Sequence, residues 1–529
     1  MDRRSNRRRL HSRPDNGIYD RLILSGMDIP ESVDTQKKAQ ENHSKMAETP
    51  VPSLILSLSV STIFTMLIAT SYNIVDTYFV SDLGESSVAA VGIMFSVMAL
   101  IQAVGYTWGM GAGSEIARLL GKQKKREAEQ TLATALAGGI LSGAVMAVIF
   151  AVFREDVVRL LGATDTSLAP AGQYGIYIML AAPVMCGAYV LNNALRAEGQ
   201  PYLALLGILA GGLSNALFDY ILVRVLGLGI AGAGIATLAG QGISLAIMYI
   251  CVRSRCSVVR LHVSDVWSFR YGVRIVRTGL PSFLRQGLMC LAAVMISRSC
   301  RQYGDGAMAG VTVANKIFAV IFAVLVGYGQ GFAPVCGFAY GAGLESRVKR
   351  SLRFTMITAV IFMCAMGAVT WVWVSEVAGV FLHEGGTQAM QLAALSLRAH
   401  AISMPFAAVC LVTGMYYQAL GAYGKATLIS ALRQGVCFIP LVFILPRMYG
   451  VDGVAFVQAA SCTAPPPMCW RGLSRPFICY IQMKNSPCLS SRPIYTAGFQ
   501  PPRSSDPRIH QGSVTQGRSK RSPPCWHRT

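Results

Sequence analysis

The stretch Val51–Gly84, VPSLILSLSVSTIFTMLIATSYNIVDTYFVSDLG, is apolar over most of its length and carries the acid Asp76 near its far end. About 20 apolar residues, at about 1.5 Å each, cross the hydrocarbon core of a bilayer, so this stretch can span one with some tilt. An ionisable residue inside a membrane helix is costly and usually marks a path for an ion or a substrate. Asp76 is therefore a candidate site residue, unless it lies at the outer interface and is simply hydrated.

The composition of the whole chain agrees with a membrane protein. Of its 529 residues, 53% are hydrophobic and 14% are charged, and the mean hydropathy is +0.45. Such a chain is too apolar for one soluble core and predicts an all-α, polytopic bundle in the lipid bilayer. The net charge of +21 lies largely in the polar ends and the loops. No base-reading motif accompanies it, so we expect no nucleic-acid partner.

Ten further apolar segments follow the first, separated by short polar breaks. They lie near residues 86–116, 127–152, 171–194, 203–223, 232–252, 273–297, 307–338, 352–374, 389–419 and 427–446. The loops between them fall into two alternating sets that differ in positive charge. One set carries Arg118, Lys122–Arg126, Arg196, Arg253–Arg274, Arg347–Arg350 and Lys425, whereas the other has only Arg154, Arg159, Arg224, Arg298, Arg301 and Arg447. Positively charged loops stay in the cytoplasm. We therefore predict a multi-pass protein of the plasma (inner) membrane with a cytoplasmic N-terminus.

The chain also repeats itself. VGYTWG at 104–109 matches VGYGQG at 326–331, which begins 222 positions later (326 minus 104), and ALRAEG at 194–199 resembles ALGAYG at 419–424. This predicts two pseudo-symmetric six-helix lobes, 49–252 and 273–461, joined by a basic cytoplasmic linker at 253–272. Parallel repeats around a central cleft are a common plan of secondary transporters.

Four motifs carry a resemblance to a known family. YNIVDTYFVSDLG (72–84), GKQKKREAEQ (121–130), NALFD (215–219) and GLPSFLRQG (279–287) resemble the multidrug and toxic compound extrusion (MATE) family, nearest its bacterial branch of DinF-like and MepA-like proteins. The resemblance covers roughly residues 50–460. It implies a twelve-helix, two-lobed, ion-coupled antiporter that exports organic cations. It also implies a monomer with no enzymatic activity and no cofactor other than a proton or Na⁺ as coupling ion.

A cation site can be inferred in the first lobe. Asn215 and Asp219 are four residues apart and so lie on one face of a helix, where their oxygens suit a proton or Na⁺. The resemblance implies that the coupling site combines Asp76, Tyr174, Asn215, Asp219 and Thr237, and that Na⁺ would bind at Asp76, Asn215 and Asp219. Judged alone, Tyr174 could be an interfacial residue, and Thr237 could bond its own helix.

The second lobe departs from this acidic pattern. Its candidate cavity-lining residues are Arg285, Gln286, Lys316 and Arg433, and Pro440 occupies the repeat position of Asp219. The basic residues argue against a sodium site in this lobe. Snorkelling of Arg285 and Arg433 toward the cytoplasm is the alternative.

Both ends of the chain differ from the middle. Residues 1–48 are polar and predict a disordered cytoplasmic tail. Pro465, Pro466 and Pro467 stop a helix before the twelfth span is complete, and we expect the Pro-, Arg- and Cys-rich tail at 462–529, which resembles sequence read out of frame, to take no part in transport. A zinc site in this tail is disfavoured, because its cysteines lack paired C-x-x-C spacing.

The sequence therefore favours an antiporter that exports organic-cation drugs or toxic metabolites. A lipid-linked precursor flippase of the same superfamily and an inactive truncated product are the alternatives. A membrane enzyme is disfavoured, because no catalytic motif of the hydrolase or metalloprotease kind is present.

Overall fold

The computed structural model describes residues 33–81, 85–161, 165–254, 257–261, 269–379 and 387–463. Within these ranges the regular structure is helical and contains no strand. Eleven of the described helical segments are long and apolar enough to cross a membrane. The predicted all-α, polytopic fold is thereby confirmed.

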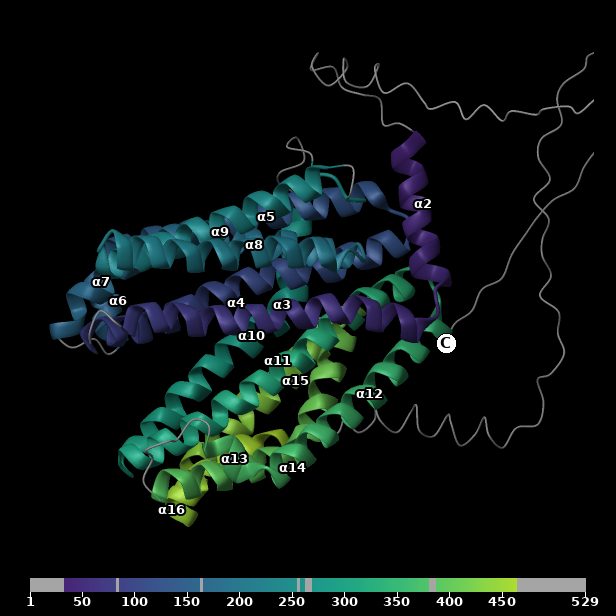
Figure 1. Ribbon diagram of the computed structural model, residues 1–529. Coiled ribbons are helices and arrows are strands. Elements are labelled where there is room, and N and C mark those ends of the chain that lie inside the picture. Colours follow the sequence, from purple (N-terminus) through teal and green to yellow (C-terminus); the bar gives the residue numbers. More distant parts are fainter. Residues whose placement is uncertain are drawn as a thin grey trace, which may run out of the picture. The chain divides into compact units, whose positions relative to one another are not determined.

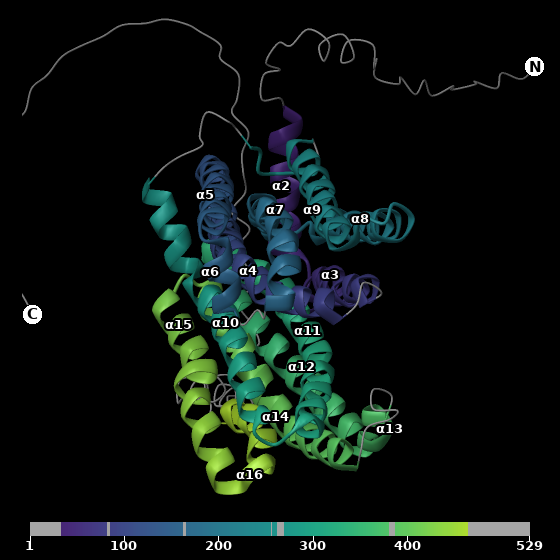
Figure 2. The same cartoon turned by 90° about the vertical axis from the view of Figure 1, so that its left-hand side faces the viewer.

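The first lobe contains six of these spans. They are α3 (Val51–Ser81), α4 (Glu85–Gly121), α5 (Lys125–Val152), α7 (Asp165–Ala197), α8 (Pro201–Asp219) continued by the π-turn η1 (Tyr220–Val225), and α9 (Gly229–Arg253), with the short α6 (Arg154–Leu160) before α7. Helix α7 packs against α4, α5 and α9, while α8 packs between α3 and α9. Figures 1 and 2 show these helices as one group.

The second lobe repeats this order. Its helices are α10 (Phe269–Arg301), α11 (Asp305–Gly341), α12 (Glu345–Val372), the short α13 (Val374–Gly379), α14 (Thr387–Ala419), α15 (Tyr423–Ala431) with the π-turn η3 (Leu432–Val436), and α16 (Phe438–Thr463). Helix α14 takes the place of α7 and packs against α11, α12 and α16. The duplication read from the sequence therefore appears as repeated packing.

Helix α16 contains a break. Gly450 has φ 59° and ψ −135°, so the eleventh span ends there and a new helix begins. The part after Gly450 that the structure describes, residues 451–463, is about 20 Å long at 1.5 Å per residue. That is shorter than the roughly 30 Å hydrocarbon core. The predicted tail 462–529 begins inside α16 with Cys462 and Thr463, and its remainder lies outside the described residues.

Part of the N-terminal tail is ordered. Residues Val33–Glu48 form helix α2, so the disorder predicted for 1–48 is wrong for this part, and residues 1–32 lie outside the described residues. Met46 is buried, and the His43 ring contacts the Phe338 ring of α11 with centroids 5.0 Å apart. Asn42 Nδ2 donates to the Glu198 carbonyl at 3.0 Å. These tertiary contacts with both lobes give the polar helix the packing that its own sequence lacks.

The two lobes approach each other closely at several glycines. Helix α10 packs on α4, and α11 packs on α3 and α4. A methyl group added to Gly279 would lie 1.9 Å from Thr107 O, and one added to Gly341 would lie 2.1 Å from Arg118 O. The same close approach occurs at Gly111, Gly121, Gly327 and Gly331. We call these six glycines the glycine seam, because their lack of a side chain lets the lobes approach closely.

Candidate functional site

Three of the predicted coupling residues lie together in the first lobe. Asn215 and Asp219 of α8 and Thr237 of α9 are all buried. With its amide nitrogen facing the carboxylate, Asn215 Nδ2 donates to Asp219 Oδ2 at 3.2 Å. The Asn215 amide oxygen accepts from the backbone N–H of Thr237, also at 3.2 Å. Asn215 thus connects the acid of one helix to the backbone of the next.

Small residues bring the two helices into this contact. A methyl group on Gly240 of α9 would lie 2.7 Å from the Asn215 Cβ atom and 2.8 Å from Gly211 O. Close approach of this kind is typical of helix pairs in membranes, where packing replaces the hydrophobic effect. The π-turn η1 begins directly after Asp219, and such turns are frequent at functional sites.

Tyr174 and the Thr237 hydroxyl have different environments. Tyr174 of α7 is fully buried and belongs to the same apolar cluster as Val223 and Ala233, so its ring packs against protein, and its part in the coupling site stays a prediction. The Thr237 hydroxyl donates to Ala233 O at 3.1 Å. The Thr237 hydroxyl therefore bonds its own helix, whereas the backbone N–H of Thr237 donates to Asn215.

Asp76 lies in α3, and its side chain is outside the described residues. Helix α3 packs against α8, η1 and α9, the elements that surround Asp219. The assignment of Asp76 to the coupling site, and of Na⁺ to Asp76, Asn215 and Asp219, stays a prediction. Among the described residues, no group of three or more His, Cys, Asp or Glu side chains is close enough to hold a metal ion.

The basic residues of the second lobe separate into two kinds. Arg433 is buried and lines a pocket together with the half-buried Arg285, so snorkelling does not describe Arg433. Gln286 points toward the first lobe, where its Nε2 donates to Gln102 Oε1 at 3.4 Å. Lys316 is exposed on α11 and does not line this pocket.

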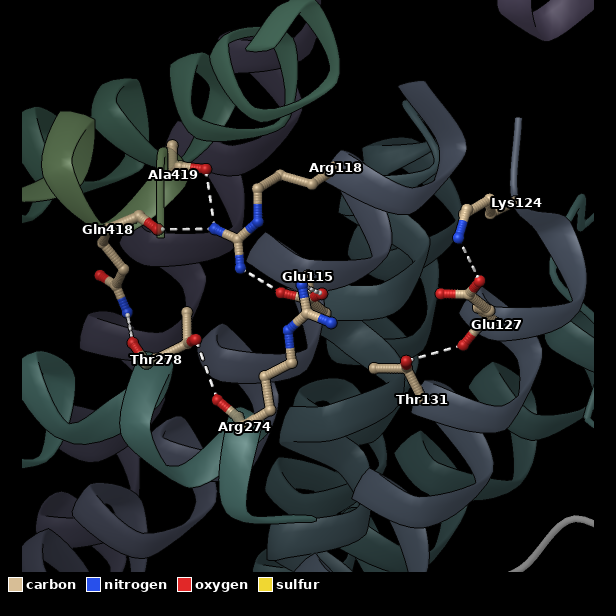
Figure 3. A network of polar contacts seen from close by, with 9 residues as sticks. All are labelled: Glu115, Arg118, Lys124, Glu127, Thr131, Arg274, Thr278, Gln418 and Ala419. Carbon is tan, nitrogen blue, oxygen red and sulfur yellow. Dashed lines mark hydrogen bonds and ion pairs between the residues drawn. The ribbon is translucent and has the colours of Figure 1, made fainter. Parts of the chain in front are cut away.

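A polar network that the sequence did not reveal joins the lobes where α4 and α14 end (Figure 3). Arg118 of α4 pairs with Glu115 and donates to Gln418 O at 3.2 Å and to Ala419 O at 2.9 Å. Arg274 of α10 pairs with the same Glu115 at 2.7 Å. A second contact between the lobes joins Arg196 of α7 to Gln330 of α11. We call this end, which also carries the basic loops, the basic end.

Glu198 holds the linker at the basic end. Its carboxylate accepts from the Ser257 hydroxyl and the Val258 backbone N–H, each at 2.8 Å. Burial raises the pKa of the Glu198 carboxyl to about 7, although these hydrogen bonds lower it in part, and Glu129 nearby raises it further. The ALRAEG motif contained this residue, but only the fold shows that it faces residues 257–261.

These features define a membrane transporter built by duplication: two repeated helical lobes, a buried acid and amide, and polar contacts between the lobes. The family model described as MatE matches residues 61–221 and 281–444, which is more than half of the chain. The chain belongs to the MATE family of multidrug efflux transporters, which are not enzymes.

Individual relatives agree with this assignment. The chain is 24% identical to the multidrug export protein MepA of Staphylococcus saprophyticus over 405 residues. These residues are 76% of this chain and 89% of that protein. It is 24% identical over 415 residues to MepA of Staphylococcus aureus, 77% of this chain and 90% of that protein.

Solved structures share the fold. A crystal structure of MATE in complex with MaL6 matches with a TM-score of 0.76 at 23% identity, over 84% of this chain and 99% of that chain. A MOP superfamily transporter from Pyrococcus furiosus, described as having a binding pocket of reverse polarity, matches with a TM-score of 0.75 at 24% identity. That match covers 84% of this chain and 98% of that one.

Proposed function

We propose that the chain is a secondary active antiporter that exports organic-cation drugs or toxic metabolites by alternating access, in exchange for protons or Na⁺. The buried contact of Asn215 with Asp219 carries this proposal. A carboxylate inside a membrane helix is costly when charged and unpaired, so binding or release of a cation there changes the energy of the surrounding helices. Each cation that moves inward down about 100 mV supplies about 2.3 kcal/mol.

The basic end is the cytoplasmic side in this proposal, because positively charged loops stay in the cytoplasm. The N-terminus then lies inside, and the membrane is the plasma membrane, as for an exporter. The network of Glu115, Arg118 and Arg274 closes the lobes against one another at this end. Release of a substrate would therefore occur at the opposite end, and breaking this network would admit substrate from the cytoplasm.

Asp219→Asn tests the proposal, because it removes the charge and keeps the size and polarity. We expect efflux of an organic-cation dye to fall to the level of empty cells, at equal abundance in the membrane. Asp452→Asn is the matched control, since Asp452 is exposed on α16 and should leave efflux unchanged. Unchanged efflux in the Asp219 variant would refute the coupling assignment.

Vesicles with imposed gradients identify the coupling ion. The second lobe offers Arg285 and Arg433 rather than an acid, which favours a proton over Na⁺. We expect a pH gradient alone to drive dye uptake into inverted vesicles. Uptake that requires a sodium gradient and ignores the pH gradient would reverse this choice.

A lipid-linked precursor flippase is the second candidate, favoured by the basic pocket at Arg285 and Arg433. Phosphate groups of such a lipid would suit these arginines. A flippase would not extrude the cationic dye, so the wild-type efflux measurement separates the two functions. An inactive product would do neither.

A further inference from the structure

A small pocket inside the second lobe is lined by α10, α14, α15 and η3. Its polar lining residues are Ser282, Arg285, Gln418, Ser430, Arg433 and Gln434. Its cavity volume is about 20 Å³, and one water needs about 10–15 Å³. The pocket therefore accepts one small polar group, and a larger ligand would extend beyond it.

Arg433 is the most deeply placed charge of this pocket. Its side chain is 7% exposed, and its Nη1 atom has no hydrogen-bond partner among the described residues. The guanidinium carbon lies 5.1 Å from the centre of the Phe322 ring. Arg433 thus has one N–H donor without an acceptor, and its charged guanidinium lies against an aromatic ring.

No acid compensates this charge in the part of the chain that the structure describes. Neither Arg433 nor Arg285 takes part in an ion pair there. The Cys462 thiol lies beside Arg433, but a thiol is uncharged below about pH 8. Arg285 is close enough to interact electrostatically with Arg433, so it adds a second positive charge.

The position of Arg433 along its helix is also unusual for a cation. Arg433 lies ten residues after Tyr423, where α15 begins, which is about 15 Å along the axis and about half the hydrocarbon thickness. An arginine at this depth is costly without a counter-charge. Its place in the π-turn η3 is typical of functional positions in helices.

The geometry points to an anion-binding subsite in which Arg433 and Arg285 bind the carboxylate of a zwitterionic or anionic small-molecule substrate. This assignment rests on the transport function proposed above and names part of its substrate class. The carboxylate supplies the missing counter-charge and accepts charge-assisted hydrogen bonds. The cationic part of a zwitterion remains available to the first lobe, where Asp219 is the buried acid.

The surroundings of the pocket favour a transported substrate over a membrane lipid. Ser282 and Gln418 of its lining are buried and joined by a hydrogen bond of 2.9 Å. Arg285 Nη2 lies 3.4 Å from the Met110 sulfur of α4, in the first lobe. The pocket thus faces the boundary between the lobes, where transporters of this architecture bind their substrates.

Rhodamine B and its ethyl ester test this subsite, because they share a ring system and differ in one carboxylate. Binding of each dye to the purified full chain in a neutral detergent is measured by fluorescence anisotropy, without an ion gradient. We expect the acid to bind at least tenfold more tightly than the ester. Arg433→Gln should weaken the acid by about 10–100-fold, the range of a lost charge-assisted contact, and the ester by less than about threefold.

Three variants control for folding and for general charge. Arg433→Lys keeps the charge and should keep the preference for the acid. Arg285→Gln should reduce the preference in part, and Lys316→Gln, which removes an exposed cation of the same lobe, should leave it unchanged. Asp219→Asn should also keep the preference, so a failure of ion coupling is distinguishable from a failure of this subsite.

Several results would overturn the proposal. Equal affinity of the two dyes, or an equal loss for both in Arg433→Gln, would show a purely structural role. Arg433 would also have a purely structural role if neither dye bound and sodium benzoate did not raise the thermal midpoint relative to sodium chloride. Displacement of the acid by phosphatidylglycerol at equimolar concentration would assign the pocket to a lipid headgroup instead.

Discussion

Glu198 makes docking of the linker depend on pH. The folded pKa is about 7, raised from an ordinary value of 4.5. Between pH 4.5 and about pH 7 the Glu198 carboxyl therefore keeps its proton when the linker is docked and loses it when the linker is open. Docking is strongest below about pH 4.5 and weakens as pH rises through about 7, at up to about 1.4 kcal/mol per pH unit.

These values give a definite magnitude. Between pH 6 and pH 8 the open form is ionised throughout, whereas the docked form loses its proton with a midpoint of about 7. The opening constant of the linker should therefore rise about tenfold over this interval. Glu198→Gln mimics the protonated acid and should remove the dependence.

Trypsin cleavage after Arg260, which lies in the segment held by Glu198, measures the opening, because cleavage follows the open population when closing is fast. The wild-type rate is divided by the Glu198→Gln rate at each pH, so the pH dependence of trypsin cancels. We expect this ratio to rise about tenfold from pH 6 to pH 8. Glu127→Gln, which changes a partly exposed acid paired with Lys124, should behave as wild type. A constant ratio would refute the role of Glu198.

Two further predictions concern the contact between the lobes. Arg118→Gln should speed hydrogen exchange of the turn at 418–421 by at least about tenfold, because the Gln418 and Ala419 carbonyls lose a charged hydrogen-bond donor, which is worth about 1.5–3 kcal/mol. The mostly exposed Arg126→Gln is the control. Equal protection in both variants would contradict the reasoning. Gly279→Ala should lower the yield and the thermal midpoint, because its methyl group would overlap Thr107 O. Gly287→Ala on the same helix has open space and should have no such effect. Similar midpoints for the two variants would show that the helices can separate at little cost in stability.

The sequence predicted the features that depend on local pattern. Apolar length located eleven spans, and the repeat between VGYTWG and VGYGQG placed α4 and α11 in equivalent positions. The spacing of four residues put Asn215 and Asp219 on one face, and with its amide nitrogen facing the carboxylate Asn215 lies 3.2 Å from Asp219 Oδ2. These predictions succeeded because the helix period is a property of the polypeptide backbone and the thickness of the bilayer sets the length of a spanning helix.

Features that depend on contacts between distant segments could not be predicted. Residues 33–48 are polar, and only contacts with Glu198 and Phe338 show why they form a helix there. Glu115 and Arg118 look like an ordinary pair on one helix, yet Arg118 also reaches carbonyls 300 and 301 positions away. The burial of Arg433 and the exposure of Lys316 depend on helix rotation, which hydropathy does not determine.

The glycine seam has a mechanical consequence. Where two bodies touch through interdigitated side chains, tilting one against the other requires many rotamers to change together. Along the glycine seam most of the closest contacts are backbone on backbone, although Ser59 Oγ lies against Gly331, so few side chains there have to change rotamer when the lobes tilt. Resistance to tilting then comes largely from the hydrogen bonds between the lobes, such as Arg118 with Ala419 at the basic end and the Thr62 hydroxyl with Gly327 O within the seam, at 2.6 Å. A few hydrogen bonds, rather than the large area of the seam, would set how fast the lobes rock.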